Sequence, residues 1–242
     1  MRIISLVPSI TELLFTLGLE EDVIGITKFC IHPDQWFRTK TRVGGTKTIH
    51  IEKVIALRPD LIIANKEENT REQVEELSAV CNVLLTDVSN LEEALDMIRT
   101  VGYQTQRPEQ ADELIFRIRQ EFSLLHLQTD YSVVYLIWKD PWMTVGGDTF
   151  INDLLSKAGF NNLFRSHFRY PTVDPDALLT LAPQKILLSS EPFPFREKHA
   201  QQLKPLFPHS EIVLVDGELF SWYGSRLLKA PAYFRQLHAG FH

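Results

Sequence analysis

The sequence contains no long hydrophobic run. No segment approaches the roughly 18 consecutive apolar residues that a membrane-spanning helix requires. The apolar run at the N-terminus, residues 3–7, is shorter than the apolar core of roughly 7–15 residues in a secretion signal, and no small-residue cleavage site follows it. We therefore interpret this run as a first β-strand, and the sequence leaves a cytoplasmic location open.

Cysteine and clustered basic residues are also scarce. Cys30 and Cys81 are the only cysteines, and Cys81 opens an apolar run, which favours a buried free thiol over a disulfide. The net charge of −6 and the lack of a basic cluster argue against a nucleic-acid partner. A content of 44% hydrophobic and 23% charged residues is that of an ordinary globular protein.

Catalytic motifs are missing from the chain. It has no G-x-S-x-G elbow, no P-loop and no G-x-G-x-x-G turn. Its eight His residues form no H-E-x-x-H motif, and His32, His50, His167 and His209 are scattered over predicted loops. These absences argue against an enzyme, and we expect no protein-only metal site and no resident cofactor.

The second half of the chain repeats a pattern of the first half. Residues 52–64 and 176–188 each read as a helix that begins with an acidic residue, a proline that ends the helix, and a short apolar strand. Pro183 lies 124 residues after Pro59, which is close to half the length of the chain. A repeat of this length predicts two similar lobes, since a solenoid would repeat every 20–50 residues or so.

An amphipathic stretch, residues 106–128, separates the two copies of the repeat. Leu114, Ile118, Phe122 and Leu125 recur at helical spacing, and Pro108 suits a first helical turn. At about 1.5 Å per residue, a helix over residues 108–126 would be roughly 28 Å long. We interpret it as a helix that joins the two lobes; the alternative is a core helix within one domain.

Strands alternate with helices on both sides of this helix, which predicts mainly parallel sheets with right-handed crossovers. The predicted fold class is therefore α/β, with two Rossmann-like lobes joined by one long backbone helix. We place the N-terminal lobe at residues 1–104, the linking helix at residues 105–129 and the C-terminal lobe at residues 130–242.

Three local predictions concern the ends of elements. Ser9 is expected to cap a helix over residues 10–17, with Glu12 at the capping-box distance. Residues 28–47 are expected to form an irregular loop. The last helix is expected to run from Ser225 to His238, and Gly18 and Gly159 are expected to end two earlier helices.

Aromatic residues gather in the loops that follow the predicted strands. Open parallel α/β sheets bind ligands at the carboxyl ends of their strands, so these loops are the candidate binding surface. A single loop aromatic more often packs into its own lobe, but several on one edge favour an apolar wall. We expect this wall to comprise Trp142, Phe193, Trp222 and Tyr223, facing Pro8, Gly45 and Asn65.

Five segments, in order along nearly the whole chain, resemble the helical-backbone family of substrate-binding proteins. They are ISLVPSITE at residues 4–12, VGG at 43–45, VIALRPDLIIA at 54–64, TVGGD at 144–148 and FSWYGSR at 220–226. That family serves ABC importers of vitamin B12, iron–siderophores and haem. The resemblance implies two lobes joined by one long helix, with a ligand clamped between them.

The resemblance also implies particular site residues. Tyr170, Glu218 and Arg226 join the expected ligand-binding set. Each lobe of the family offers a surface Glu to Arg residues of a membrane permease. The first of these positions falls at Arg71, so its neighbour Glu72 is the candidate, and Glu191 and Glu197 compete for the second.

The function expected from the resemblance is binding without catalysis. A metal chelate such as cobalamin, a ferric siderophore or haem would be the ligand, and an ABC permease and its ATPase would be the partners. We expect a monomer, no nucleic-acid partner, and a periplasmic or other extracytoplasmic location. The alternative is a cytosolic α/β enzyme or cobamide-handling protein on the same two-lobe frame.

Overall fold

The computed structural model describes residues 1–127 and 131–240. Its residue contacts divide the chain into two units. Unit 1 comprises Met1–Val88, Glu92–Arg119 and Trp222–Leu227, and unit 2 comprises Ser89–Leu91, Gln120–Ser221 and Leu228–His242. Two short segments lie outside the described residues, namely 128–130 and 241–242. The first is where the predicted linking segment meets the predicted C-terminal lobe. The predicted lobe boundaries stay a prediction.

Unit 1 is built on a five-stranded parallel sheet. Its strands lie in the order β3 (Thr41–Arg42), β2 (Val23–Ile26), β1 (Ile3–Ser5), β4 (Leu61–Asn65) and β5 (Val83–Thr86). The central strands β1 and β4 are buried along their whole length. Their continuous apolar runs are typical of strands that are covered on both faces.

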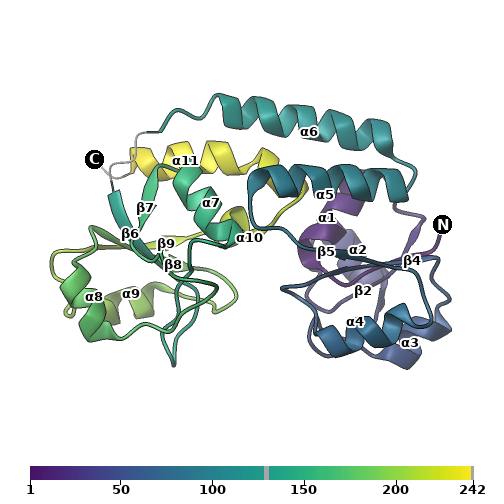
Figure 1. Ribbon diagram of the computed structural model, residues 1–242, viewed down its shortest axis with the longest axis horizontal. Helices are drawn as coiled ribbons and strands as arrows, with labels where there is room; N and C mark the ends of the chain where they lie inside the picture. Colours follow the sequence, from purple (N-terminus) through teal and green to yellow (C-terminus); the bar gives the residue numbers. More distant parts are fainter. Residues whose placement is uncertain (128–130, 241–242) are drawn as a thin grey trace. The chain divides into compact units, whose positions relative to one another are not determined.

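Helices cover both faces of this sheet (Figure 1). They are α1 (Pro8–Thr16), α2 (Asp34–Thr39), α3 (Ile51–Ala56), α4 (Arg71–Ser78) and α5 (Leu91–Gln104). α3 and α4 lie on one face and α1 and α5 on the other. Val54 of α3, Leu77 of α4 and Ile62 of β4 belong to one buried hydrophobic cluster, which holds the first layer to the sheet.

Unit 2 is built on a four-stranded parallel sheet. Its strands lie in the order β7 (Phe160–Asn162), β6 (Tyr131–Leu136), β8 (Lys185–Ser189) and β9 (Glu211–Val215). The helices of this half are α7 (Phe150–Lys157), α8 (Pro175–Leu181), α9 (Glu197–Leu203), α10 (Glu218–Ser221) and α11 (Ala230–Ala239). α8 and α9 cover one face, and α7 and α11 the other (Figure 1).

The internal repeat is present in the packing as well as in the sequence. Val54 and Ile62 lie in the hydrophobic cluster of unit 1, and their counterparts Leu178 and Ile186 lie in the corresponding cluster of unit 2. Gly18 and Gly159 have φ angles of 76° and 75° just after α1 and α7, as expected of helix-ending glycines. The predicted α/β fold with two parallel sheets is therefore confirmed.

The long helix α6 (Pro108–Ser123) runs beside α5 (Figure 1). A Cβ added at Gly102 of α5 would lie 2.3 Å from the Cβ of Ala111, so the glycine permits the close approach of the two helices. The boundary between the units falls within α6, after Arg119, and the helix thus contributes to both units. It ends three residues before the predicted His126, where the Leu125 N–H donates to the Phe122 carbonyl in a turn.

Three local predictions were wrong. Pro8 occupies the first turn of α1, so Val7 is the N-cap and Ser9 does not cap the helix. The Glu12 carboxylate accepts hydrogen bonds from Arg226 instead of forming a capping box. Residues 28–47 are not wholly irregular, because they contain α2 and the short edge strand β3. The last helix is split: residues 225–228 form a 3₁₀ helix, and α11 begins only at Ala230, with Pro231 in its first turn.

Candidate functional site

The order of the strands marks one position in each sheet where a ligand could bind. In unit 1, β2 follows β1 in the sequence and pairs with one edge of β1, whereas β4 pairs with its other edge. In unit 2, β6 leads to β7, and β8 lies on the opposite side. Open α/β sheets bind ligands at such switch points, outside the carboxyl ends of the strands. The candidate surfaces are therefore the loops after β1 and β4, and those after β6 and β8.

Two buried asparagines fix the loop after β4. The side-chain oxygen of Asn65 accepts hydrogen bonds from the Glu67 and Glu68 N–H groups, and its amide nitrogen donates to the Thr86 carbonyl and hydroxyl. The Asn69 side chain accepts from the Asn65 N–H and donates to the Thr46 carbonyl. The loop is thereby held in one conformation against the loop that follows β3.

These contacts change the interpretation of Asn65. Its side chain is fully buried and uses both donors and both acceptors within unit 1, so it offers no free polar atom to a ligand. Gly45 is buried nearby, and a Cβ there would lie 2.8 Å from the Thr48 hydroxyl oxygen. Pro8 is half-buried at the start of α1. Asn65 thus shapes the loop after β4, and ligand contact by Asn65, Pro8 and Gly45 stays a prediction.

Glu68 is a candidate site residue that the sequence analysis did not single out. It is half-buried, and burial raises the pKa of its carboxyl group, partly offset by the nearby Lys47 ammonium. Within the described ranges, 1–127 and 131–240, this carboxylate forms no hydrogen bond or ion pair. It lies near the Cys30 thiol, whose pKa is also raised by burial. An unpaired carboxyl group of this kind at a switch point is a candidate functional group.

The raised pKa of Glu68 predicts a stability that depends on pH. Burial disfavours the ionised form in the folded state, so Glu68 destabilises the protein once the pH rises through its folded-state pKa. We expect Glu68→Gln to raise the free energy of unfolding by up to about 1 kcal/mol at pH 7. The gain should vanish near pH 4, where the unfolded state is also protonated. Urea denaturation at both pH values tests this, with the exposed Glu76→Gln as control; a loss of stability at pH 7 would contradict it.

The Trp222–Leu227 segment packs onto α1 within unit 1. The Arg226 guanidinium makes a two-pronged ion pair with the Glu12 carboxylate, with both N–O distances 2.9 Å. The same guanidinium lies 4.6 Å from the Trp222 ring centroid, and the His32 ring packs edge-on against Trp222. These side chains thus fasten the segment to α1.

This burial bears on three residues expected at the ligand. Trp222 and Tyr223 are 7% and 6% exposed, and the Arg226 side chain is 11% exposed. Their contacts give Trp222 and Arg226 a structural role in unit 1. A role for these three residues in ligand binding stays a prediction.

Hydrogen bonds also organise the loop after β8 in unit 2. The Ser189 hydroxyl donates to the Glu191 carbonyl at 2.5 Å and accepts from the buried Tyr135 hydroxyl at 3.0 Å. Burial raises the pKa of Tyr135, so this phenol stays protonated. The Glu191 carboxylate accepts a hydrogen bond from the Ser221 hydroxyl at 2.6 Å. Ser189 corresponds to Asn65 in the repeat, and both bond to the residue two positions on.

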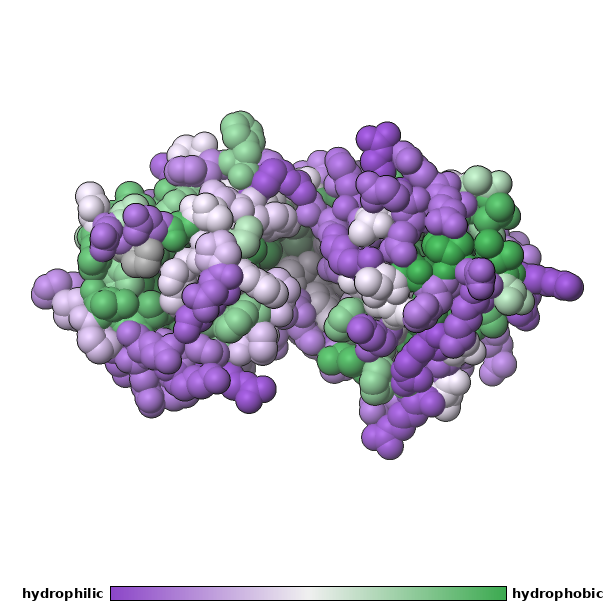
Figure 2. Space-filling model, turned by 90° about the horizontal axis from the view of Figure 1, so that it is seen from below, coloured by the Kyte–Doolittle hydropathy of each residue, from purple (hydrophilic) through white to green (hydrophobic). Residues whose placement is uncertain are grey.

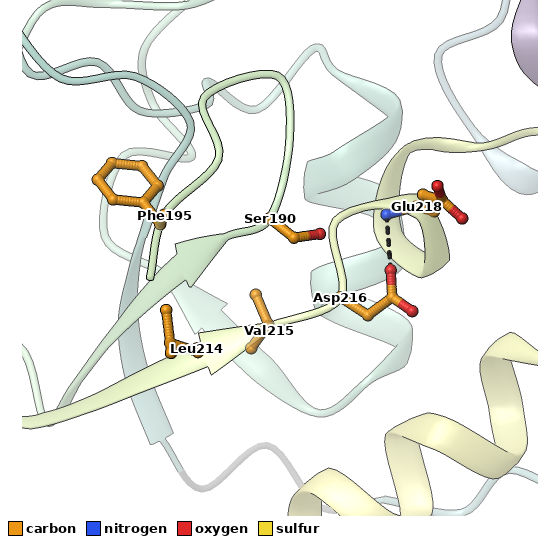
Figure 3. A pocket seen from close by; sticks show the side chains of 6 residues that line it. All are labelled: Ser190, Phe195, Leu214, Val215, Asp216 and Glu218. Atoms are coloured by element: carbon orange, nitrogen blue, oxygen red, sulfur yellow. Dashed lines mark hydrogen bonds between the residues drawn. The ribbon is translucent and has the colours of Figure 1, made fainter. Parts of the chain in front are cut away.

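A pocket of about 470 Å³ opens at the carboxyl ends of β8 and β9 (Figure 3). Its lining comprises Ser190, Phe195, Leu214, Val215, Asp216 and Glu218. The Asp216 carboxylate accepts a hydrogen bond from the Glu218 N–H at 3.0 Å, and the Ser190 hydroxyl accepts one from the Gly217 N–H. Of the residues expected at the ligand, Glu218 alone lines this pocket. Its two acidic side chains suit a ligand with hydrogen-bond donors.

The aromatic residues of unit 2 form one cluster. The Trp142 ring stacks on Phe195 at 5.9 Å, and Phe193 packs against both Phe195 and Trp138. Trp142 and Phe193 are partly buried against the core, whereas Trp138 is 40% exposed. Tyr170 is half-buried, with the Arg169 guanidinium over its ring. Trp142 and Phe193 therefore belong to the same aromatic cluster of unit 2. The predicted apolar wall, which also includes Trp222 and Tyr223, stays a prediction.

Hydrophobic areas lie between hydrophilic ones on the face shown in Figure 2, and several large hydrophobic side chains are exposed. Two of them, Phe29 and Ile31, follow β2 in unit 1 and are 51% and 45% exposed. The Lys28 ammonium lies 5.1 Å from the Phe29 ring centroid, and both residues would crowd a Cβ at Gly45. The loop after β2 thus adds an apolar group beside the predicted site residue Gly45.

The three candidate docking residues differ in their surroundings. Glu72 lies in the first turn of α4 and Glu197 in the first turn of α9, and both are exposed. α4 follows β4 and α9 follows β8, so these turns are equivalent in the repeat. Glu191 is instead half-buried and bonded to Ser221. The exposed pair is therefore better placed for a partner, and docking itself stays a prediction.

Two other features are absent from the described residues. No group of three or more His, Cys, Asp or Glu side chains in the described part of the chain could hold a metal ion. Among the helices of those residues, none is long and apolar enough to cross a membrane. Cys30 and Cys81 are free thiols. Cys30 is buried, whereas Cys81, which was predicted to be buried, is half-buried.

Comparison with known proteins places the chain in a family. The family model described as periplasmic binding protein matches residues 3–205. The chain belongs to the periplasmic binding protein family. A member from Photorhabdus laumondii, a vitamin B12-binding protein, is 29% identical over 195 residues, which cover 78% of this chain and 70% of the relative. A vitamin B12-binding protein of Yersinia pestis is 26% identical over 194 residues, with 78% and 69% covered.

Solved structures of periplasmic binding proteins share the whole fold. The periplasmic vitamin B12-binding protein of Vibrio cholerae superposes with a TM-score of 0.78 at 22% identity, covering 98% of this chain and 97% of that one. A periplasmic haem-binding protein from Pseudomonas aeruginosa gives 0.81 at 22% identity, covering 98% and 91%. At this level of identity the likeness shows the fold.

Proposed function

We propose that this periplasmic binding protein captures a metal chelate and delivers it to an ABC permease. The observation that carries the proposal is the family match over residues 3–205. The parallel sheet of unit 2 ends in loops rich in aromatic and polar groups, which suits ligand binding. The proposed ligand is a corrinoid such as cobalamin, a haem or a ferric siderophore. Relatives described as binding vitamin B12, haem and iron support this range.

The proposed mode of action is binding without catalysis. Apolar contact would come from the aromatic cluster of unit 2 and from Phe29, and polar contact from the carboxyl groups at the ends of the strands. The expected partners are the permease and its ATPase, with no nucleic acid, and the protein is expected to act as a monomer. An extracytoplasmic location follows from the family as an expectation.

Thermal denaturation in the presence of candidate ligands tests the proposal. A ligand present at 100 times its dissociation constant should stabilise the folded protein by about 2.7 kcal/mol. We expect one class among cobinamide, cyanocobalamin, haemin and a ferric hydroxamate to raise the melting temperature, and isothermal titration calorimetry to give one site per chain.

Metal-free counterparts of each chelate serve as controls, because they separate recognition of the chelate from binding of the organic part. If no chelate shifts the melting temperature at millimolar concentration, and none gives heat on titration, the proposal is wrong. A small-molecule turnover product would favour the alternative of a two-lobe enzyme.

A further inference from the structure

We propose that Glu68 is a ligand-recognising residue that selects chelates with peripheral N–H or O–H donors over chelates with peripheral carboxylates. The inference rests on the proposed function and adds the chemical class of the ligand. It is carried by the position of Glu68 at the switch point of unit 1, by its unpaired carboxylate, and by the rigidity of its loop.

The loop presents Glu68 in a fixed position. Its N–H donates to the Asn65 side chain, and Asn69 on its other side is tied to the Thr46 carbonyl. Both asparagines are buried. A side chain between two such anchors loses little conformational freedom when a ligand binds, which favours affinity. Glu68 therefore resembles a preorganised binding group more than a solvated loop acid.

The surroundings leave the carboxylate in need of a donor. The charged or titratable groups that act on it are the Lys47 ammonium, the Glu67 carboxylate and the Cys30 thiol. Lys47 donates instead to the Glu67 carbonyl at 2.6 Å, and the Cys30 sulfur pairs with the Thr27 hydroxyl at 3.1 Å. A half-buried acceptor without a partner is costly to the folded protein. A donor on the ligand would supply the missing bond.

Exposed apolar groups flank Cys30, whose thiol interacts electrostatically with this acid. Phe29 and Ile31 come from the loop after β2, which also carries Cys30. Phe29 is near Gly45, and Gly45 is two residues before Lys47. One side of unit 1 thus combines an aromatic ring with a carboxylate acceptor. This combination fits a flat chelate with amide or amine groups on its rim.

Unit 2 shows the same chemistry independently. Its pocket is lined by the acidic side chains of Asp216 and Glu218. Carboxylates at the strand ends of either unit, taken by itself, disfavour a ligand that carries its own carboxylates, such as the propionates of haem. Amide-rich corrinoids are the favoured class on this reasoning.

Calorimetric titration with two probes tests the inference. Cobinamide carries peripheral amides, whereas haemin carries two propionates. We expect Glu68→Ala to weaken cobinamide binding about tenfold to a hundredfold, as loss of a hydrogen bond to a charged group does, and Glu68→Gln to retain part of the affinity because it keeps one acceptor. Haemin should bind both variants as well as, or better than, it binds the unsubstituted protein.

Glu76→Ala is the matched control, because it removes one carboxylate from an exposed face of α4 and leaves the switch point intact. Unchanged cobinamide affinity in Glu68→Ala would overturn the inference. So would an equal loss for both probes, which indicates a structural role, or a protein that binds haemin and not cobinamide. The last outcome leaves the proposed function standing, whereas failure to bind any chelate overturns both.

Discussion

Replacing Arg226 with methionine should lower the free energy of unfolding by about 3–5 kcal/mol. Arg226 and Glu12 are 11% and 14% exposed and form two charge-assisted hydrogen bonds of 2.9 Å. Methionine would leave the Glu12 carboxylate buried without a partner and remove the cation from the Trp222 ring. The Trp222–Leu227 segment would lose its main attachment to α1.

Urea denaturation followed by circular dichroism measures this loss. Arg38→Met is the matched control, because Arg38 pairs with Asp34 at 74% and 68% exposure, where an ion pair contributes at most about 1 kcal/mol. The double variant Glu12→Gln/Arg226→Met should recover part of the loss, since it removes both charges. A cost below about 1 kcal/mol for Arg226→Met would show that this pair does not fasten the segment.

The repeat and the two-sheet fold could be predicted because their signals are local. A proline that follows a short helix and precedes an apolar run specifies the same helix–strand unit in both halves. The elements that were missed are short. β3 has two residues at the edge of its sheet, and α2 has six, so neither shows a full hydrophobic period.

The site was less predictable because its contacts join residues that are distant in the sequence. Glu12 and Arg226 are 214 residues apart, and only the folded chain shows that they neutralise each other. The sequence analysis placed Arg226 and Trp222 in the expected ligand-binding set without showing these contacts, and their role in ligand binding stays a prediction. Asn65 was also placed in that set, and the structure adds that its side chain makes four internal hydrogen bonds.

Glu68 was overlooked for a different reason. It belongs to the polar run Lys66–Asn69, in which any acid reads as solvated. The available signal was the pair of asparagines, Asn65 and Asn69, around it, because such residues fix turns with their side chains. The sequence could suggest a structured loop there. It could not show which acid lay without a partner.

The docking proposal predicts the largest functional effect. The double variant Glu72→Ala/Glu197→Ala should reduce permease-coupled uptake at least tenfold while leaving chelate affinity unchanged. Both residues lie exposed in the first turns of equivalent helices, α4 and α9, where the helix dipole favours a carboxylate. A carboxylate buried against a permease Arg contributes about 2–5 kcal/mol, so each single variant should have a partial effect.

Uptake into vesicles that contain the permease and ATPase, with calorimetry on the same proteins, provides the measurement. Glu76→Ala is the matched control, since it removes an equally exposed acid from a later turn of α4. Glu191→Ala separates the competing candidate: its carboxylate bonds to Ser221, so its loss should change stability or chelate affinity and spare docking. Normal uptake by the double variant would remove the docking proposal. Lost uptake in Glu191→Ala, with affinity and stability intact, would transfer the docking role to Glu191.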